Sequence, residues 1–266
     1  MTAANYLPTM HEVSINEGGW SDHPDDPGGA TMKGIIQREY DAFRKRKGRP
    51  LQSVRYITDD EVAEIYRSQY ASKVRFDDLP AGVDYATLDG AINSGVSRGS
   101  KWLQGALGVK TDGVIGNQTV SAAVASDAVK TIKKMCGARS SFLHGLSTFK
   151  VFGKGWSARV ARVEATSVAM AQKSRGAQPS GIAASALIES ESAKKNSTSA
   201  SGTAGASALG SGTSATQVDW THLTGTQSLI LIAVVLGGIA LAAYLFHRSR
   251  TQMARSEAYA AVAAGA

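Results

Sequence analysis

Over residues 1–175 the apolar positions recur every three or four residues, the spacing that places them on one face of an α-helix. Thr58 to Glu61 has the form of a capping box, which marks a helix start. Strand-like alternation is almost absent, apart from a small hairpin expected over residues 20–31. The pattern therefore predicts a mainly α domain. Its apolar stripes are Ile35, Ile36, Tyr40 and Phe43; Val62, Ile65 and Tyr66; Leu88, Ala91 and Ile92; Trp102, Leu103, Ala106 and Leu107; Val129, Ile132, Met135 and Cys136; and Val160, Val163, Val168 and Ala169.

Residues 176–228 follow a different pattern. Ser, Ala, Gly and Thr dominate this segment, and most of it has no apolar period. Such composition is typical of a flexible linker. The linker leaves one domain of about 170 residues, which is long enough to bury its own core.

Residues 229–246 are 18 consecutive positions without a charge, rich in Leu, Ile, Val and Ala. As a helix they extend roughly 27 Å, close to the hydrocarbon thickness of a bilayer. A buried core helix is the alternative, but only about 20 residues follow to cover it. We therefore expect a single transmembrane helix over 229–246, with the lipid bilayer as a partner and residues 247–266 as a short basic tail.

The charges that flank this segment predict an orientation. Arg248, Arg250 and Arg255 follow it, so the positive-inside rule places the C-terminus in the cytoplasm and the N-terminal domain outside. The sequence thus predicts a single-pass membrane protein with a periplasmic domain. Residues 1–8 have neither a charged n-region nor a long apolar run, so no cleavable signal peptide is visible.

Glu17 is the first candidate for chemistry. A short helix is expected over residues 8–17, and Gly18-Gly19 end it. The Glu17 carboxyl group then meets the negative end of the helix, and Trp20 can add an apolar wall; both favour the protonated acid. Such an acid can donate its proton to a leaving glycosidic oxygen. The alternative is a solvated acid beside an ordinary glycine cap.

The loop that follows can supply a second carboxylate. Residues 24–29 hold two prolines and two glycines, which indicate a structured turn rather than a linker. Asp25 and Asp26 lie within this turn and can return to face Glu17, while Thr31 can hold a water molecule. Three acids in the loop also fit calcium, but the alternating ligands and closing Glu of an EF-hand are missing, so we expect no metal.

The residues from Glu17 to Trp20, those from Pro24 to Thr31, and Lys33-Gly34-Ile35 resemble glycoside hydrolase family 108. That family comprises the N-acetylmuramidases of phage endolysins and secretion-associated lysozymes. The Glu of its Glu-Gly-Gly-Tyr motif is the catalytic acid, which implies this role for Glu17. Trp20 stands where Tyr is usual and keeps a sugar-stacking surface, and His23 stands where Asp is more frequent. An Asp nine positions after the acid, followed by Thr31, also resembles phage-type lysozyme, which favours Asp26 over Asp25.

Later motifs extend the resemblance to roughly residues 7–173. They are similar to the predicted peptidoglycan-binding domain that accompanies these muramidases. The resemblance implies a lysozyme-like catalytic region over residues 1–83 and a peptidoglycan-binding helical region over 84–175. Asn93 is either a helix C-cap or a hydrogen-bond donor to sugar. The motifs are Asp89–Gly95, Lys101–Val109, Asp112–Thr119, Phe142–Phe149, Phe152–Trp156 and Arg159-Val160.

Charge agrees with a wall substrate. The chain of 266 residues has a formal net charge of +7, and residues 1–176 hold 24 Lys and Arg against 18 Asp and Glu. A basic surface suits an acidic polymer such as murein. Nucleic acid also fits the charge, but no nucleic-acid motif accompanies it, so we expect no nucleic-acid partner. Cys136 is the sole cysteine and excludes an intramolecular disulfide.

Together these features predict an enzyme that cleaves the β-1,4 bond between N-acetylmuramic acid and N-acetylglucosamine. Glu17, Asp26 and Thr31 are the expected catalytic residues, and Trp20, Asp25 and Asn93 the expected substrate contacts. We expect no cofactor. An endolysin is the first interpretation. The alternatives are a non-catalytic membrane-anchored wall-binding protein and a muramidase that opens the wall locally for a secretion system or virion.

Overall fold

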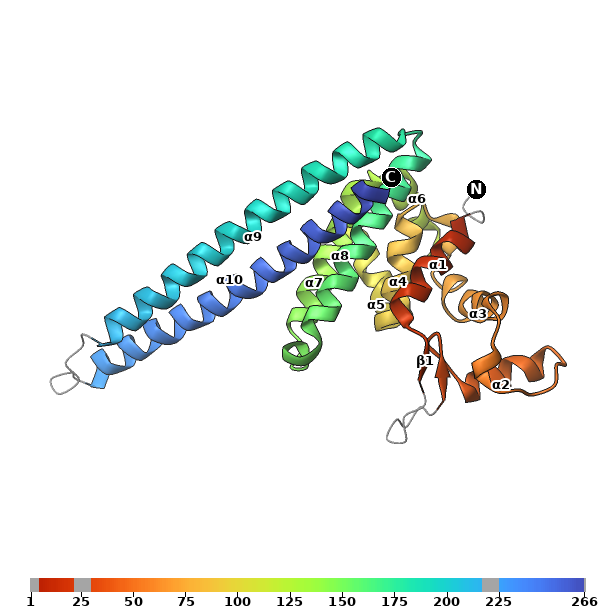
Figure 1. The fold of residues 1–266 in the computed structure, drawn as a ribbon, viewed down its shortest axis with the longest axis horizontal. Helices are drawn as coiled ribbons and strands as arrows, with labels where there is room; N and C mark the ends of the chain where they lie inside the picture. Colours follow the sequence, from red (N-terminus) through yellow and green to blue (C-terminus); the bar gives the residue numbers. More distant parts are fainter. Residues whose placement is uncertain (1–4, 22–29, 217–224, 266) are drawn as a thin grey trace. The chain divides into compact units, whose positions relative to one another are not determined.

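The computed structural model describes residues 5–21, 30–216 and 225–265, and omits the side chains of residues 16, 202, 204–216, 225–232, 234 and 235. Most of the described chain is helical, so the predicted mainly α class is confirmed (Figure 1). The chain divides into two compact units, Met1–Arg139 and Ser140–Ala266.

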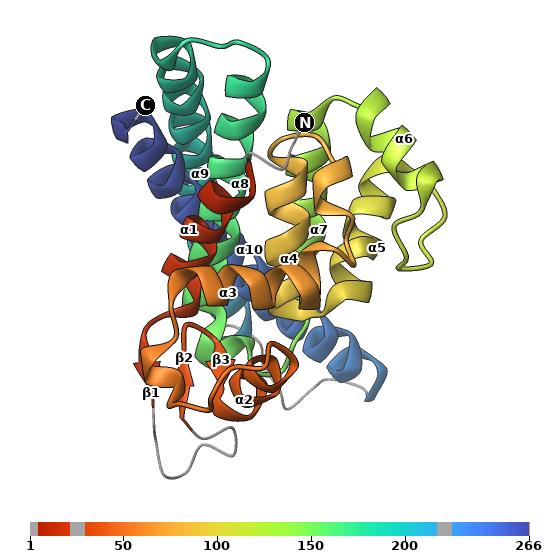
Figure 2. The same cartoon turned by 90° about the vertical axis from the view of Figure 1, so that its right-hand side faces the viewer.

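The first helix leads directly into a small sheet. Helix α1 runs from Tyr6 to Glu17, and Gly18 follows it with φ of 76°, a conformation that glycine adopts without strain. The sheet has three antiparallel strands in the order β1 (Trp20–Ser21), β2 (Thr31–Met32) and β3 (Ile35–Ile36). Figure 2 shows β1, β2 and β3 side by side. The strands confirm the expected small hairpin, whose residues 22–29 lie outside the described part of the chain.

Two helices and a connecting 3-10 turn follow the sheet along the chain. Helix α2 is Gln37–Arg46, η2 is the 3-10 turn Val54–Tyr56, and α3 is Asp59–Tyr66, which continues as the π-helical turn η3 (Arg67–Ala71). The capping box at the start of α3 is present: the Thr58 hydroxyl accepts from the Glu61 N–H, and the Glu61 carboxylate accepts from the Thr58 N–H.

The remaining helices that begin in the first unit are α4 (Val83–Ser94), α5 (Val96–Leu107), α6 (Asn117–Ala125) and α7 (Ala128–His144), which follow the 3-10 turn η4 (Phe76–Asp78). Helix α7 crosses the boundary between the two units, since its residues from Ser140 onward belong to the second. Helix α4 is buried along most of its length and packs on α5. A buried ion pair joins α4 to α7, because Nη1 of Arg139 donates to Oδ2 of Asp89 at 2.6 Å.

The second unit contains α8 (Phe149–Ser174), α9 (Pro179–Thr216) and α10 (Gly225–Gly265). Helices α9 and α10 run side by side in both views (Figures 1 and 2). The structure therefore differs from the flexible linker expected over 176–228: most of that segment is helical. Hydrogen bonds from Ser190 to the Ser256 carbonyl at 2.9 Å and from Ser197 to the Ser249 carbonyl at 3.0 Å explain the difference, since a partner helix satisfies the polar side chains.

The predictions of a membrane span and of a single-pass membrane location are wrong. Within the described ranges, no helix combines the length and the apolar character needed to cross a bilayer. Residues 229–246 instead form part of α10, which continues through the expected basic tail to Gly265. Hydropathy depends on the local segment alone, whereas in the structure α10 packs against α9 and α8, with Leu245 and Ser249 buried.

Candidate active site

Glu17 is the last residue of α1, and its side chain is half-buried. It lies against Gly34, in the turn between β2 and β3: a Cβ atom built on Gly34 would stand 2.8 Å from Oε2 of Glu17 and 3.4 Å from its Cβ. The same Cβ atom would also overlap the hydroxyl oxygen of Tyr66. The helix end, the hairpin turn and α3 therefore meet at the Glu17 side chain.

The turn beneath Glu17 has a defined geometry. Met32 pairs with Ile35, so Lys33 and Gly34 form a two-residue hairpin loop. Both have positive φ, at 50° and 76°, as a type I′ turn requires. The Tyr66 hydroxyl donates to the Lys33 carbonyl oxygen at 3.0 Å, and Lys33 forms an ion pair with Asp59. Helix α3 thus holds this turn from its start and from its end.

Two further residues belong to the surroundings of Glu17. The ring of Tyr70 lies 5.6 Å from that of Tyr66. Burial raises the pKa of Tyr70, and the negative charges of Glu39 and Glu17 raise it further. Both carboxylates therefore lie within electrostatic reach of one phenol. In the sequence, Tyr66 has the spacing of an apolar stripe, and no local pattern marks Tyr70 or Glu39 as residues near Glu17.

Trp20 and Thr31 lie on the strands beside this turn. Thr31 is half-buried on β2 and pairs with Ser21 and Ile36. The Trp20 side chain on β1 is 38% exposed, and the guanidinium of Arg55 lies 5.4 Å from its ring centroid. Asp25 and Asp26, the expected second carboxylates, lie outside the described residues.

Comparison with known proteins places this geometry in a family. Residues 10–95 match the model of glycosyl hydrolase 108, and residues 98–161 match that of a predicted peptidoglycan domain. The solved structure of Brucella abortus SagA is 44% identical, with a TM-score of 0.55, over 64% of this chain and 97% of that chain. No curated protein matches.

The chain belongs to glycosyl hydrolase family 108. It is a peptidoglycan hydrolase of the N-acetylmuramidase type, and peptidoglycan is its partner. The first family match includes Glu17, the whole hairpin, and Asn93. The enzyme class predicted from the sequence is therefore confirmed.

Asn93 has a different setting from the hairpin residues of the hydrolase. It lies near the end of α4, and its Oδ1 accepts hydrogen bonds from Nη2 of Arg139 at 3.1 Å and from the hydroxyl of Ser94 at 3.1 Å. The glycine cap that ends α4 is Gly95, with φ of 91°. The amide oxygen of Asn93 thus supports the buried Asp89–Arg139 pair, and its side chain remains exposed at the surface.

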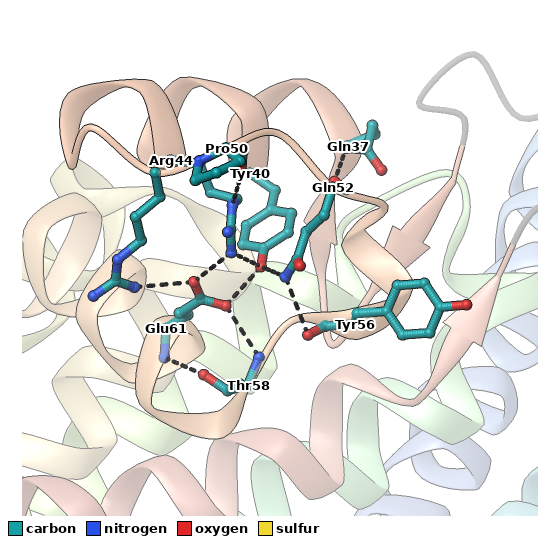
Figure 3. Close-up of polar contacts among 9 residues, drawn as sticks. Gln37, Tyr40, Arg44, Pro50, Gln52, Tyr56, Thr58 and Glu61 are labelled. Atoms are coloured by element: carbon teal, nitrogen blue, oxygen red, sulfur yellow. Dashed lines mark hydrogen bonds and ion pairs between the residues drawn. The ribbon is translucent and has the colours of Figure 1, made fainter.

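Glu61 is a buried acid near the hairpin, and its partners assign it a structural role. Its carboxylate accepts from the Tyr40 hydroxyl at 2.6 Å, from Arg44 at 2.9 Å and from Arg49 at 3.0 Å (Figure 3). Burial opposes its charge, but the hydrogen bonds from Tyr40 and the Thr58 N–H and the two guanidinium groups together hold its pKa below the ordinary value. A carboxylate surrounded in this way holds α2 against α3 and is not available as a proton donor.

Proposed function

We propose that Glu17 is the general acid of the family 108 hydrolase and protonates the glycosidic oxygen as it leaves C1 of N-acetylmuramic acid, so that this oxygen becomes the 4-hydroxyl group of N-acetylglucosamine. The observation that carries this proposal is the placement of its half-buried carboxyl group at the C-terminal end of α1, against Gly34 and three residues before the exposed Trp20 that begins β1.

The second carboxylate completes the mechanism. We assign this role to Asp26, with Asp25 as the alternative, because Asp26 stands nine positions after Glu17 and is followed by Thr31, an order that resembles phage-type lysozyme. Its charge stabilises the oxocarbenium-like transition state or activates the water that attacks the sugar. Thr31, on β2, orients that water, and a separation of about 6.5 to 9.5 Å between the two carboxyl groups leads to inversion, whereas about 5 to 5.5 Å leads to retention.

Binding of the glycan is assigned to residues outside the acid pair. The exposed ring of Trp20 stacks on a sugar, Asp25 contacts its hydroxyl groups, and the Asn93 amide donates from α4. Cleavage is assigned to residues 1–83 and wall binding to residues 84–175, as the sequence predicts. Endolysin activity, as opposed to local opening of the wall, stays a prediction.

Replacement of the proposed acid tests the mechanism. Glu17→Gln keeps the size of the side chain but removes its titratable proton, so we expect the release of reducing ends from purified peptidoglycan to fall by about 100- to 10,000-fold. Glu12→Gln is the matched control, since Glu12 is another half-buried acid of α1. Mass spectrometry of the released muropeptides identifies the bond that is cleaved.

The two variants should have the same melting temperature and should bind insoluble peptidoglycan equally well. An active Glu17→Gln enzyme would remove the assignment of Glu17. In the same assay, Asp26→Asn should lose more activity than Asp25→Asn, and the reverse order would transfer the second role to Asp25.

A further inference from the structure

Gly34 marks the closest approach between the hairpin and the proposed acid. Its Cα faces both the Glu17 side chain and the Tyr66 hydroxyl, and a Cβ there would overlap the hydroxyl and stand 2.8 Å from Oε2 of Glu17. Any side chain at position 34 must therefore displace one of these two groups. A methyl group at position 34 would overlap the Tyr66 hydroxyl most closely and would also press on the Glu17 carboxyl group.

Tyr66 holds the turn that contains Gly34 in place. Its ring is 3% exposed, so its position is set by the packing of α3. Its one hydroxyl proton is donated to the Lys33 carbonyl oxygen at 3.0 Å. This bond links a residue of the buried core to the turn that carries Gly34. Because the core is closely packed, the bond from Tyr66 holds the turn at a fixed position relative to the end of α1.

We propose that Tyr66 and Gly34 are positioning residues for Glu17: the tyrosine hydroxyl fixes the Lys33-Gly34 turn, and the bare Cα of Gly34 forms the surface against which the Glu17 carboxyl group is held. The inference rests on the proposed role of Glu17 as the acid. Neither residue exchanges a proton with the substrate. Their effect is geometric, since a general acid must stand within hydrogen-bond reach of the leaving oxygen and a displacement of 1 Å is enough to lower the rate by about 100-fold.

Two substitutions test the positioning. Gly34→Ala places a methyl group at the point of contact, and we expect kcat on purified peptidoglycan to fall about 100-fold while KM stays within about twofold. Tyr66→Phe keeps the ring and removes only the hydroxyl, which frees the turn without filling the space, so we expect a smaller loss of kcat, about 10-fold, again with little change in KM.

The chain offers a matched control for each substitution. Gly48 also has positive φ, at 64°, but a Cβ there meets no atom within 4 Å, so Gly48→Ala carries the backbone strain of the alanine without the contact. Tyr56 is 69% exposed, so Tyr56→Phe removes a phenol hydroxyl at the surface. Both controls should keep the wild-type kcat, and melting temperatures measured for all four variants separate a loss of fold from a loss of rate.

The outcomes are distinct. Wild-type kcat in Tyr66→Phe, or a loss in Gly34→Ala no greater than in Gly48→Ala, overturns the inference, and so does a change confined to KM. If Glu17→Gln is inactive while the Gly34 and Tyr66 variants are fully active, the catalytic proposal stands and the positioning inference fails. If Glu17→Gln is active, the catalytic proposal itself fails, whatever the other variants show.

Discussion

Asp84 is a carboxyl group that folding places in an unfavourable setting. It is fully buried at the start of α4, where its Oδ2 accepts from the Asn5 amide at 2.9 Å and its Oδ1 accepts from the backbone N–H groups of Gly82 and Tyr85, each at 2.7 Å. Burial raises the pKa of Asp84 to about 6, although these hydrogen bonds act in the opposite direction. The folded chain therefore binds this proton more tightly than the unfolded chain, whose value is 3.8.

This difference predicts a loss of stability as the pH rises from about 4 to about 6, because the unfolded state releases the proton first. The free energy of unfolding falls by about 2 to 3 kcal/mol in total, and this loss is complete above the pKa of Asp84 in the folded chain. Asp84→Asn should remove it, so that urea unfolding between pH 4 and pH 7 shows a less negative slope than in the wild type. Asp60→Asn, at an exposed position of α3, is the control. Equal slopes for Asp84→Asn and the wild type would contradict the prediction.

At the scale of elements, a buried acid joins the three helices of the second unit. Glu164 on α8 accepts at Oε1 from Nη2 of Arg255 at 2.6 Å and from the Tyr259 hydroxyl at 3.0 Å, both on α10. Glu189 on α9 lies 3.9 Å from the same guanidinium. A buried charge of this kind is stable only while its partner is present. The cluster therefore makes the packing of α10 on α8 depend on one arginine.

Arg255→Met keeps most of the apolar stem and leaves Glu164 without its cation, so the free energy of unfolding should fall by about 3 kcal/mol. Amide hydrogen exchange should become faster over the C-terminal half of α10, and this rate measures the local stability of that helix directly. Arg248→Met, at an exposed position of the same helix, should change neither quantity. Adding Glu164→Gln to Arg255→Met should recover much of the loss. No recovery would mean that Arg255 acts through packing alone.

At the scale of the whole molecule, the dominant electrostatic property is its net charge of +7. The substrate of the enzyme, peptidoglycan, bears the carboxylates of its peptides. Attraction between an exposed basic surface and such a polymer is screened as salt is added, because the Debye length shortens from about 10 Å at 0.1 M to about 3 Å at 1 M.

Binding of the inactive Glu17→Gln chain to insoluble peptidoglycan should therefore weaken several-fold between these two salt concentrations. Sedimentation of the bound fraction measures it. Chitin is the control polymer, because it has the same type of glycan linkage without peptide carboxylates, and its binding should change little. Equal salt dependence of binding to the two polymers would show that the positive charge of the enzyme does not interact with the peptide carboxylates.

Much of the first unit could be predicted from local sequence. The helix that ends at Glu17, the turn at Gly18, the capping box at Thr58 and the short hairpin all depend on neighbours within a few positions, and all are present. The expected linker and membrane span could not be judged in this way. Their helices pair over long sequence distances, with Ser197 and Ser249 52 residues apart, and composition alone does not report a distant partner.

The sequence by itself determined the family, the enzyme class and the proposed acid, because these depend on residue types at fixed spacing. Only the tertiary structure decided what surrounds that acid. Tyr66 has the periodicity of a core residue, and only the packing of α3 against the β2–β3 turn brings its hydroxyl to Lys33. Gly34 is one glycine among 28 in the chain, and its Cα lies beneath Glu17 because the helix and the hairpin converge there. Contacts of this kind arise from long-range packing, which local pattern does not encode.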